Sequence, residues 1–161
     1  MRRIILGVLL VFAAWLAFAD FESARSQAQP WMAPVVTPNE RDALEWVIAN
    51  TPERAVFVTD IFGGEFLMGN TRREGTVGGD WAVIPNVVER MHDIQYAFYQ
   101  AKTPEEAHAT ALKYGAEYVW APDRKVFAGY EWVELNRSLF VPPYFSLEFD
   151  NGAAIYRVNP A

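Results

Sequence analysis

The chain has 161 residues, of which 14 are basic and 20 are acidic, and it contains no cysteine. Two of the basic residues, Arg2 and Arg3, precede the first acidic residue, so the sequence from Asp20 onward carries 12 basic against 20 acidic side chains, a net charge of −8. This balance disfavours nucleic-acid binding, which needs a basic face. The lack of cysteine excludes disulfides, thiolate metal sites and a cysteine nucleophile.

An unbroken apolar run from Ile4 to Ala19 follows the two arginines. It fits a cleavable signal peptide, with Ala17-Phe18-Ala19 as the cleavage site, and it also fits a signal anchor. We expect the anchor, with residues 1–21 as a transmembrane helix that contacts the lipid bilayer through residues 4–21. Basic residues before the run and acidic residues after it predict a single-pass protein of the cell membrane, with a cytoplasmic N-terminus and an extracytoplasmic domain.

Two stretches follow the apolar run. Residues 22–36 are polar and then proline-rich, which predicts a tether between the membrane and a domain. Residues 37–161 carry alternating helix and strand patterns, and they predict an extracytoplasmic α/β domain.

Capping boxes mark the start of two helices in this domain. Thr37 and Glu40 take the N-cap and N3 positions of the first, and Thr103 and Glu106 those of the second. A proline follows each threonine, at the N1 position that proline favours. Apolar residues at helical spacing predict another helix within residues 85–99.

Two short apolar runs with β-branched or aromatic residues, 55–59 and 117–120, predict buried strands. After the first strand, the glycine pair at 63–64 predicts a tight turn, and residues 65–84 predict a long surface loop with one short helix at its beginning. A further helix is expected around residues 130–137.

The C-terminal part predicts a β-hairpin. Apolar runs at 145–149 and 153–158 flank Asn151-Gly152, a pair that favours a two-residue type I′ turn. Two strands separated by helices predict a parallel pair. The expected fold class is therefore α/β, with a small mixed sheet of one parallel pair plus a C-terminal β-hairpin, flanked by helices and preceded by one N-terminal transmembrane helix.

An ordered set of short motifs resembles a known family. In chain order they are Leu44-Glu45-Trp46-Val47-Ile48, Ala55 to Asp60, Gly78-Gly79-Asp80-Trp81, Arg90 with Asp93 and Phe98-Tyr99, Lys113-Tyr114-Gly115, Glu117-Tyr118-Val119, and Ile155-Tyr156-Arg157-Val158. Together they resemble the soluble C-terminal domain of polytopic membrane glycosyltransferases of the GT-C type, and most closely that of YYY-type membrane proteins.

The resemblance implies an extracytoplasmic α/β domain that follows a last transmembrane helix. The catalytic carboxylates of GT-C enzymes lie on loops between other membrane helices, outside this sequence. The family's glycine-glutamate-arginine run after the second strand is replaced here by Ala121-Pro122-Asp123-Arg124. The resemblance therefore implies a fold and a location, and it carries over no activity.

Polar side chains are expected to gather where the two predicted parallel strands end, because open α/β sheets bind ligands at that edge. Arginines there can hold a phosphate or a sugar carboxylate by bidentate bonds. The alternative is that the aspartate after the first strand caps the next turn and the arginines form ordinary ion pairs. The candidate ligand or partner contacts at this edge are Asp60, Arg72, Arg73, Asp123 and Arg124, and Arg90 and Asp93 are further candidates from the next polar cluster, which also contains His92.

Tyr130 and Trp132 are candidate partner contacts, because aromatic residues are enriched in interfaces, although packing in the core is the alternative. His92 and His108 lack a partner at the spacing that a zinc site uses, so no metal ion is expected. The glycine pairs match no phosphate-binding or dinucleotide-binding motif, and no cofactor is expected.

No catalytic constellation is visible in the sequence. We therefore expect a non-catalytic, single-pass membrane protein that acts as an accessory or structural subunit of a larger complex, with an integral membrane protein or a second copy as its partner. One alternative is the acceptor-recognition component of a split glycosyltransferase. Another is a secreted binding protein released by signal cleavage after Ala19.

Overall fold

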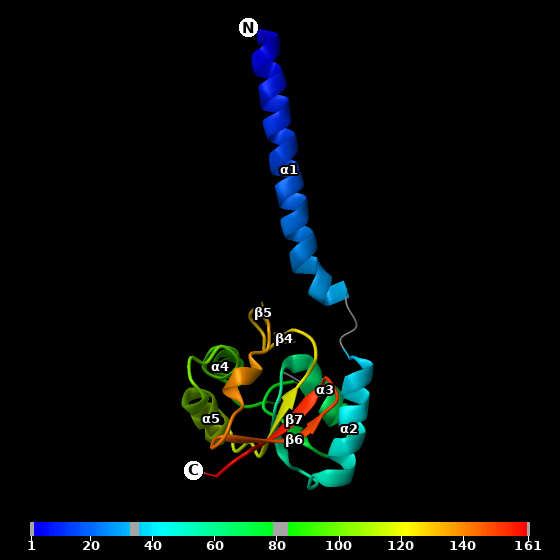
Figure 1. The fold of residues 1–161 in the computed structure, drawn as a ribbon, viewed down its shortest axis with the longest axis vertical. Coiled ribbons are helices and arrows are strands. Elements are labelled where there is room, and N and C mark those ends of the chain that lie inside the picture. Colours follow the sequence, from blue (N-terminus) through cyan, green and yellow to red (C-terminus); the bar gives the residue numbers. More distant parts are fainter. Residues whose placement is uncertain (1, 33–35, 79–83, 161) are drawn as a thin grey trace. The chain divides into compact units, whose positions relative to one another are not determined.

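The computed structural model describes residues 2–32, 36–78 and 84–160. The chain divides into two compact units, Met1–Val35 and Val36–Ala161. The first unit contains the helix α1 (Arg2–Met32), and the second contains all the other elements labelled in Figure 1.

Helix α1 exposes large apolar side chains along its middle. These residues have exposed fractions between 44% and 72%, and they are Leu9, Leu10, Val11, Phe12, Trp15, Leu16, Phe18 and Phe21. The helix continues to Met32, so most of the predicted tether is helical. Among the described residues, no helix combines the length and the hydropathy that a membrane crossing requires.

The second unit is a mixed α/β domain, as predicted. Its elements in chain order are α2 (Pro38–Asn50), β1 (Val56–Val58), α3 (Ile61–Asn70), β2 (Glu74–Gly75), α4 (Val87–Asp93), the π-helix η1 (Ile94–Tyr99), α5 (Pro104–Lys113), β3 (Tyr118–Ala121), β4 (Val126–Phe127), β5 (Trp132–Val133), the 3₁₀-helix η2 (Arg137–Leu139), β6 (Phe145–Asp150) and β7 (Ala154–Val158).

Five of the described strands form one sheet in the order β2-β1-β3-β7-β6. Strand β1 pairs in parallel with β2 and β3, whereas β7 runs antiparallel to β3 and β6. The predicted parallel pair is present, and the predicted C-terminal hairpin is confirmed in the antiparallel pairing of β6 with β7 but not in its turn. Strands β4 and β5 form a separate two-stranded ribbon.

Helices cover both faces of the sheet, with α4 and α5 on one side and α2 and α3 on the other (Figure 1). Alternate residues of the central strand β3 serve these two layers. Val119 packs in the cluster with η1 and α5, while Tyr118 and Trp120 pack in the cluster with α2 and α3. Both faces of β3 are therefore buried, which explains why its sequence is a continuous apolar run.

Both predicted capping threonines cap their helices. The Thr37 hydroxyl accepts a hydrogen bond from the Glu40 amide at 3.2 Å, and the Glu40 carboxylate accepts one from the Thr37 amide at 2.9 Å. The Thr103 hydroxyl accepts from the Glu106 amide at 3.2 Å, whereas the Glu106 carboxylate reaches the amide of Lys102 instead.

The tight turn predicted at Gly63-Gly64 is wrong, because both glycines lie inside α3. Glycine is needed at both positions because other parts of the chain lie too close for a side chain. A Cβ on Gly64 would collide with the carbonyl oxygen of Val77, and one on Gly63 would crowd the ring of Trp120. Within the predicted loop 65–84, α3 extends to Asn70 and β2 follows, while residues 79–83 lie outside the described residues.

The helix expected around residues 130–137 is also wrong. Gly129, at a φ of +124°, reverses the chain, so that Phe127 pairs with Trp132 and Val126 with Val133 in the β4–β5 ribbon. Between this ribbon and β6, the described residues form one short helix, η2. The helix predicted within residues 85–99 is present as α4 and then continues as the π-helix η1.

The two-residue turn predicted at Asn151-Gly152 is wrong in length. Asp150 pairs with Ala154, so three residues connect β6 to β7. A type I′ turn needs positive φ at both central residues, and here Gly152 has φ of +114° while Asn151 does not. The Asn151 side chain instead donates to the Asn39 carbonyl oxygen at 3.3 Å, so the turn is fixed against α2.

Candidate functional site

The ends of β1 and β3 bring together the three charged side chains of the strand-end cluster, which we define as Glu40, Asp60 and Arg124. Asp60 follows β1 and caps α3 by accepting from the Gly63 amide at 2.9 Å. Arg124 follows β3, and Glu40 reaches the same place from the first turn of α2. Both carboxylates are fully buried, and the Arg124 side chain is 11% exposed.

The guanidinium of Arg124 uses all five of its N–H groups inside the protein. Its Nη1 donates to Asp60 Oδ2 at 2.7 Å and to the Lys125 carbonyl oxygen at 3.0 Å. Its Nη2 donates to Glu40 Oε1 at 3.0 Å and to Asp60 Oδ1 at 3.2 Å. Its Nε donates to Glu40 Oε2 at 3.2 Å. No donor of Arg124 is left for a phosphate or a carboxylate ligand.

Attraction between opposite charges stabilises the strand-end cluster. Burial by itself would lower the pKa of Arg124, but the charge and hydrogen bonds of Asp60, followed by those of Glu40, outweigh burial and raise this pKa. The Trp120 indole adds a donor to Glu40 at 3.2 Å. Two carboxylates against one guanidinium leave one negative charge, which further N–H donors stabilise.

Two buried polar groups belong to the π-helix η1. Burial, and after it the charge of Asp60, raise the pKa of the Tyr99 hydroxyl, while Arg124 opposes this effect. Within the described residues, the Tyr99 hydroxyl and the Gln95 Nε2 have no hydrogen-bond partner. Gln95 Oε1 does accept from the Ala128 amide at 3.2 Å, so η1 is joined to the chain just after β4.

Arg73 caps the C-terminal end of α2 with its side chain and does not reach the strand-end cluster. It is 8% exposed, and its Nη2 donates to the carbonyl oxygens of Thr51 at 2.6 Å, Ile48 at 3.1 Å and Val47 at 3.3 Å. These carbonyls belong to the last turn of the helix, which lacks intrahelical donors. Arg72 points into solvent and pairs with Glu53 at 3.3 Å.

Asp93 lies in a second group of charges, on the surface between α4 and α5. Its carboxylate accepts from Lys113 at 2.6 Å and from the Tyr114 hydroxyl at 2.7 Å. The hydrogen bond from Lys113 is the main reason why the pKa of Asp93 is lowered, and burial opposes it. The Arg90 guanidinium lies over the Tyr114 ring, 5.3 Å from its centroid.

Asp123 joins the end of β3 to the start of the domain. Its two carboxylate oxygens accept from the Thr37 hydroxyl and from the Asn39 amide group, each at 2.6 Å. This exposed pair of bonds lies next in sequence to the strand-end cluster, because Arg124 is the following residue. The predicted neighbours Asp60, Asp123 and Arg124 thus do gather near one edge of the sheet.

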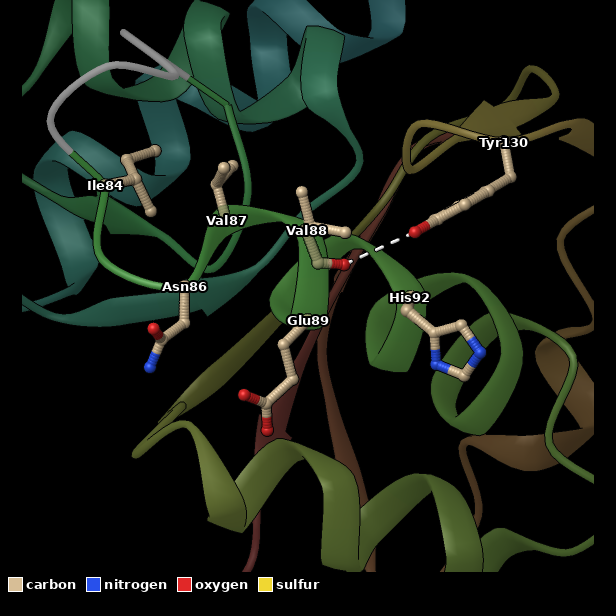
Figure 2. Close-up of a pocket in the computed structure, with 7 residues that line it drawn as sticks. All are labelled: Ile84, Asn86, Val87, Val88, Glu89, His92 and Tyr130. Carbon is tan, nitrogen blue, oxygen red and sulfur yellow. Dashed lines mark hydrogen bonds between the residues drawn. The ribbon is translucent and has the colours of Figure 1, made fainter.

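Tyr130 and Trp132 lie in different surroundings, although they are two residues apart. Trp132 stacks on Phe62, with 5.5 Å between ring centroids, and is half-buried. Tyr130 is 44% exposed and its hydroxyl donates to the Val88 carbonyl oxygen at 3.4 Å. Figure 2 shows Tyr130 reaching across toward α4 at one side of a surface pocket of about 660 Å³.

This surface pocket is lined by three aliphatic and four polar side chains. Its lining residues are Ile84, Asn86, Val87, Val88, Glu89, His92 and Tyr130. Sequence reasoning did not single out the aliphatic members, because their spacing is also that of a helix face in the core. Within the described residues, no three His, Asp or Glu side chains are arranged to hold a metal ion.

Sequence reasoning also missed Glu40 as a member of the strand-end cluster. Its capping-box position explains one of its bonds, but the bonds to Trp120 and Arg124 span 80 and 84 residues of sequence. No local pattern signals such a contact. The arrangement is suited to fixing α2 against the strand ends, and it offers no exposed acid or base.

Comparison of the chain with protein-family models gives no match, and comparison with curated proteins gives none either. The resemblance to the soluble domain of GT-C-type proteins stays a prediction.

Proposed function

We propose that this protein is a non-catalytic accessory subunit of a membrane protein complex, held at the cell membrane by α1, with its α/β domain outside the cytoplasm. The observation that supports this most is the belt of exposed apolar side chains on α1. Residues 9–12 are consecutive and all at least 55% exposed, so they cover every side of the helix. Exposure of such an apolar surface to water is unfavourable, whereas contact with lipid or with apolar helices of a partner is favourable.

The strand-end cluster supports a contact role over catalysis. Its three side chains bond to one another, and the arginine has no donor to spare for substrate. Arg73, Asp93 and Asp123 are likewise engaged inside the domain. Catalysis needs an acid, a base or a nucleophile that is free to reach a reacting atom, and these groups already hold hydrogen bonds within the domain.

Membrane fractionation of the full chain tests this proposal. We expect the protein to stay with membranes after alkaline carbonate extraction. Val11→Arg should release it, because an arginine near the centre of a membrane helix costs about 2.5–3.5 kcal/mol on insertion scales. Ile48→Arg, at an exposed apolar position of α2, is the matched control and should not. Extraction of the unmodified chain by carbonate would contradict membrane insertion.

A further inference from the structure

The surface pocket beside α4 carries an exposed apolar side chain at its rim. Val88 is 68% exposed, the largest value among the large apolar side chains described in the domain. Next to it, His92 and the rings of Tyr96 and Tyr130 form a mutually contacting group, with centroid distances of 4.9 Å, 5.5 Å and 6.1 Å. Exposed apolar surface of this kind, with aromatic rings at its border, is typical of a contact site.

The chemistry of the pocket selects the charge of its occupant. No lysine or arginine lines it, and Glu89 supplies a carboxylate (Figure 2). Arg90, although on the same helix, lies over Tyr114 instead. Lys113 does pair with Glu89 at 3.0 Å, but both side chains are more than half exposed, and such pairs hold only weakly. Lys113 would keep its bond to Asp93 at 2.6 Å if a cation from outside took its place at Glu89.

We infer that this pocket binds a segment of a partner protein that carries an aliphatic side chain next to a lysine or arginine. The aliphatic group would pack on Val87 and Val88, and the cation would reach Glu89 or the face of Tyr130, since aromatic faces attract cations. The assignment rests on the proposed function, because it names the contact that holds the domain in its complex. The net charge of −8 from Asp20 onward disfavours a second copy or an anionic lipid surface as the occupant.

Site-specific photo-crosslinking in cells that contain the natural partners tests the inference. A benzophenone amino acid replaces Val88 in the full chain, and in a matched control it replaces Leu147, which is 57% exposed on β6. We expect an adduct from position 88 and none from 147. Mass spectrometry should place the crosslink on a different protein, at an apolar residue within a few positions of a lysine or arginine.

Two variants sharpen the test. Tyr130→Ala and Glu89→Lys should each lower the adduct yield about tenfold, the loss expected when one anchor of an interface is removed. Glu89→Lys lies on the surface, so it keeps the test valid if Tyr130→Ala fails to fold. An adduct with a second copy of the chain, with lipid, or with an acidic segment would overturn the inference.

The outcomes also separate this inference from the proposed function. If the chain stays in a large membrane complex and position 88 gives no adduct, the pocket assignment is wrong and the accessory role stands. If the chain is soluble but position 88 still crosslinks to a basic segment, the pocket assignment holds and the membrane role fails.

Discussion

Arg124 donates a hydrogen bond to each oxygen of the Asp60 carboxylate, with N–O distances of 2.7 Å and 3.2 Å, although the two residues are 64 positions apart in the sequence. Asp60 follows β1 and Arg124 follows β3, so the pair joins two adjacent parallel strands just beyond their carboxyl ends. In many open α/β sheets this edge is open to ligands. Here Glu40 reaches this edge from α2, and the carboxylates of Glu40 and Asp60 are fully buried by their contacts with Arg124.

The first prediction concerns Arg124 itself. Arg124→Met should lower the free energy of unfolding by about 3–5 kcal/mol, because it leaves the buried carboxylates of Glu40 and Asp60 without their counter-ion. Urea denaturation of the full chain measures this loss. Arg72→Met is the control, since Arg72 is exposed and should change stability by about 0.5 kcal/mol or less. A loss for Arg124→Met no larger than that of the control would show that the cluster is not a structural element.

The second prediction concerns the end of α2. Arg73→Met should lower the free energy of unfolding by about 1–3 kcal/mol, because the carbonyl oxygens of Val47, Ile48 and Thr51 lose their shared donor and those of Val47 and Thr51 lie in buried residues. Arg73→Lys should restore part of the loss, since a cation near a helix C-terminus is favourable. Thermal unfolding followed by circular dichroism distinguishes the two variants. Equal stability of the Met and Lys variants would argue against the capping role.

The third prediction uses two glycines in different conformations. Gly152→Ala should destabilise the domain by about 1–3 kcal/mol, because Gly152 has φ of +114° and an added Cβ would collide with Asn39. Gly69→Ala should stabilise it by about 0.5–1 kcal/mol, because Gly69 lies in α3 with open space around it. Denaturation of the two variants side by side gives the sign of each effect. Stabilisation by Gly152→Ala would refute the observed turn.

The fourth prediction concerns pH and Asp93. The pKa of Asp93 is lowered below its ordinary value of 3.8, mainly by the hydrogen bond from Lys113, so the ionised form is favoured in the folded state. The stabilisation is therefore fully present above that ordinary value and is lost as the pH falls through the lowered pKa. Lys113→Met should raise the pKa of Asp93, as measured by carbon NMR of its carboxyl group.

The difference in unfolding free energy between this variant and the unmodified chain should shrink as the solution is acidified. Lys125→Met is the control, because Lys125 pairs only with the exposed Glu134 at 3.4 Å among the contacts seen in the described residues. A difference that persists unchanged in acid would mean that Lys113 stabilises the fold through packing and not through Asp93.

The parts of the fold that sequence predicts well depend on local chemistry. Thr37 and Glu40 are three residues apart and form a capping box, and the short apolar runs at β1 and β3 form parallel strands. Gly63 and Gly64 show the opposite case. Their local pattern favours a turn, but the approach of Val77 and Trp120 requires glycine inside a helix, and no short-range pattern encodes that approach.

The candidate site was predictable only in part, for the same reason. The edge of the sheet was identified from the strand ends, and Asp60, Asp123 and Arg124 do meet there. The sequence predicts Arg73 on a glycine-rich loop as a contact at that edge, but its side chain is buried against the end of α2. Its burial depends on where α2 ends, about 25 residues earlier in the chain.

The bonds between Asp123 and the pair Thr37 and Asn39 have a mechanical consequence. The chain enters the domain at these residues, and they are tied to the loop after β3, a central strand of the sheet. Tension that arrives along the chain from α1 therefore loads two hydrogen bonds of 2.6 Å and then the Glu40–Arg124 ion pair before it can peel α2 from the sheet.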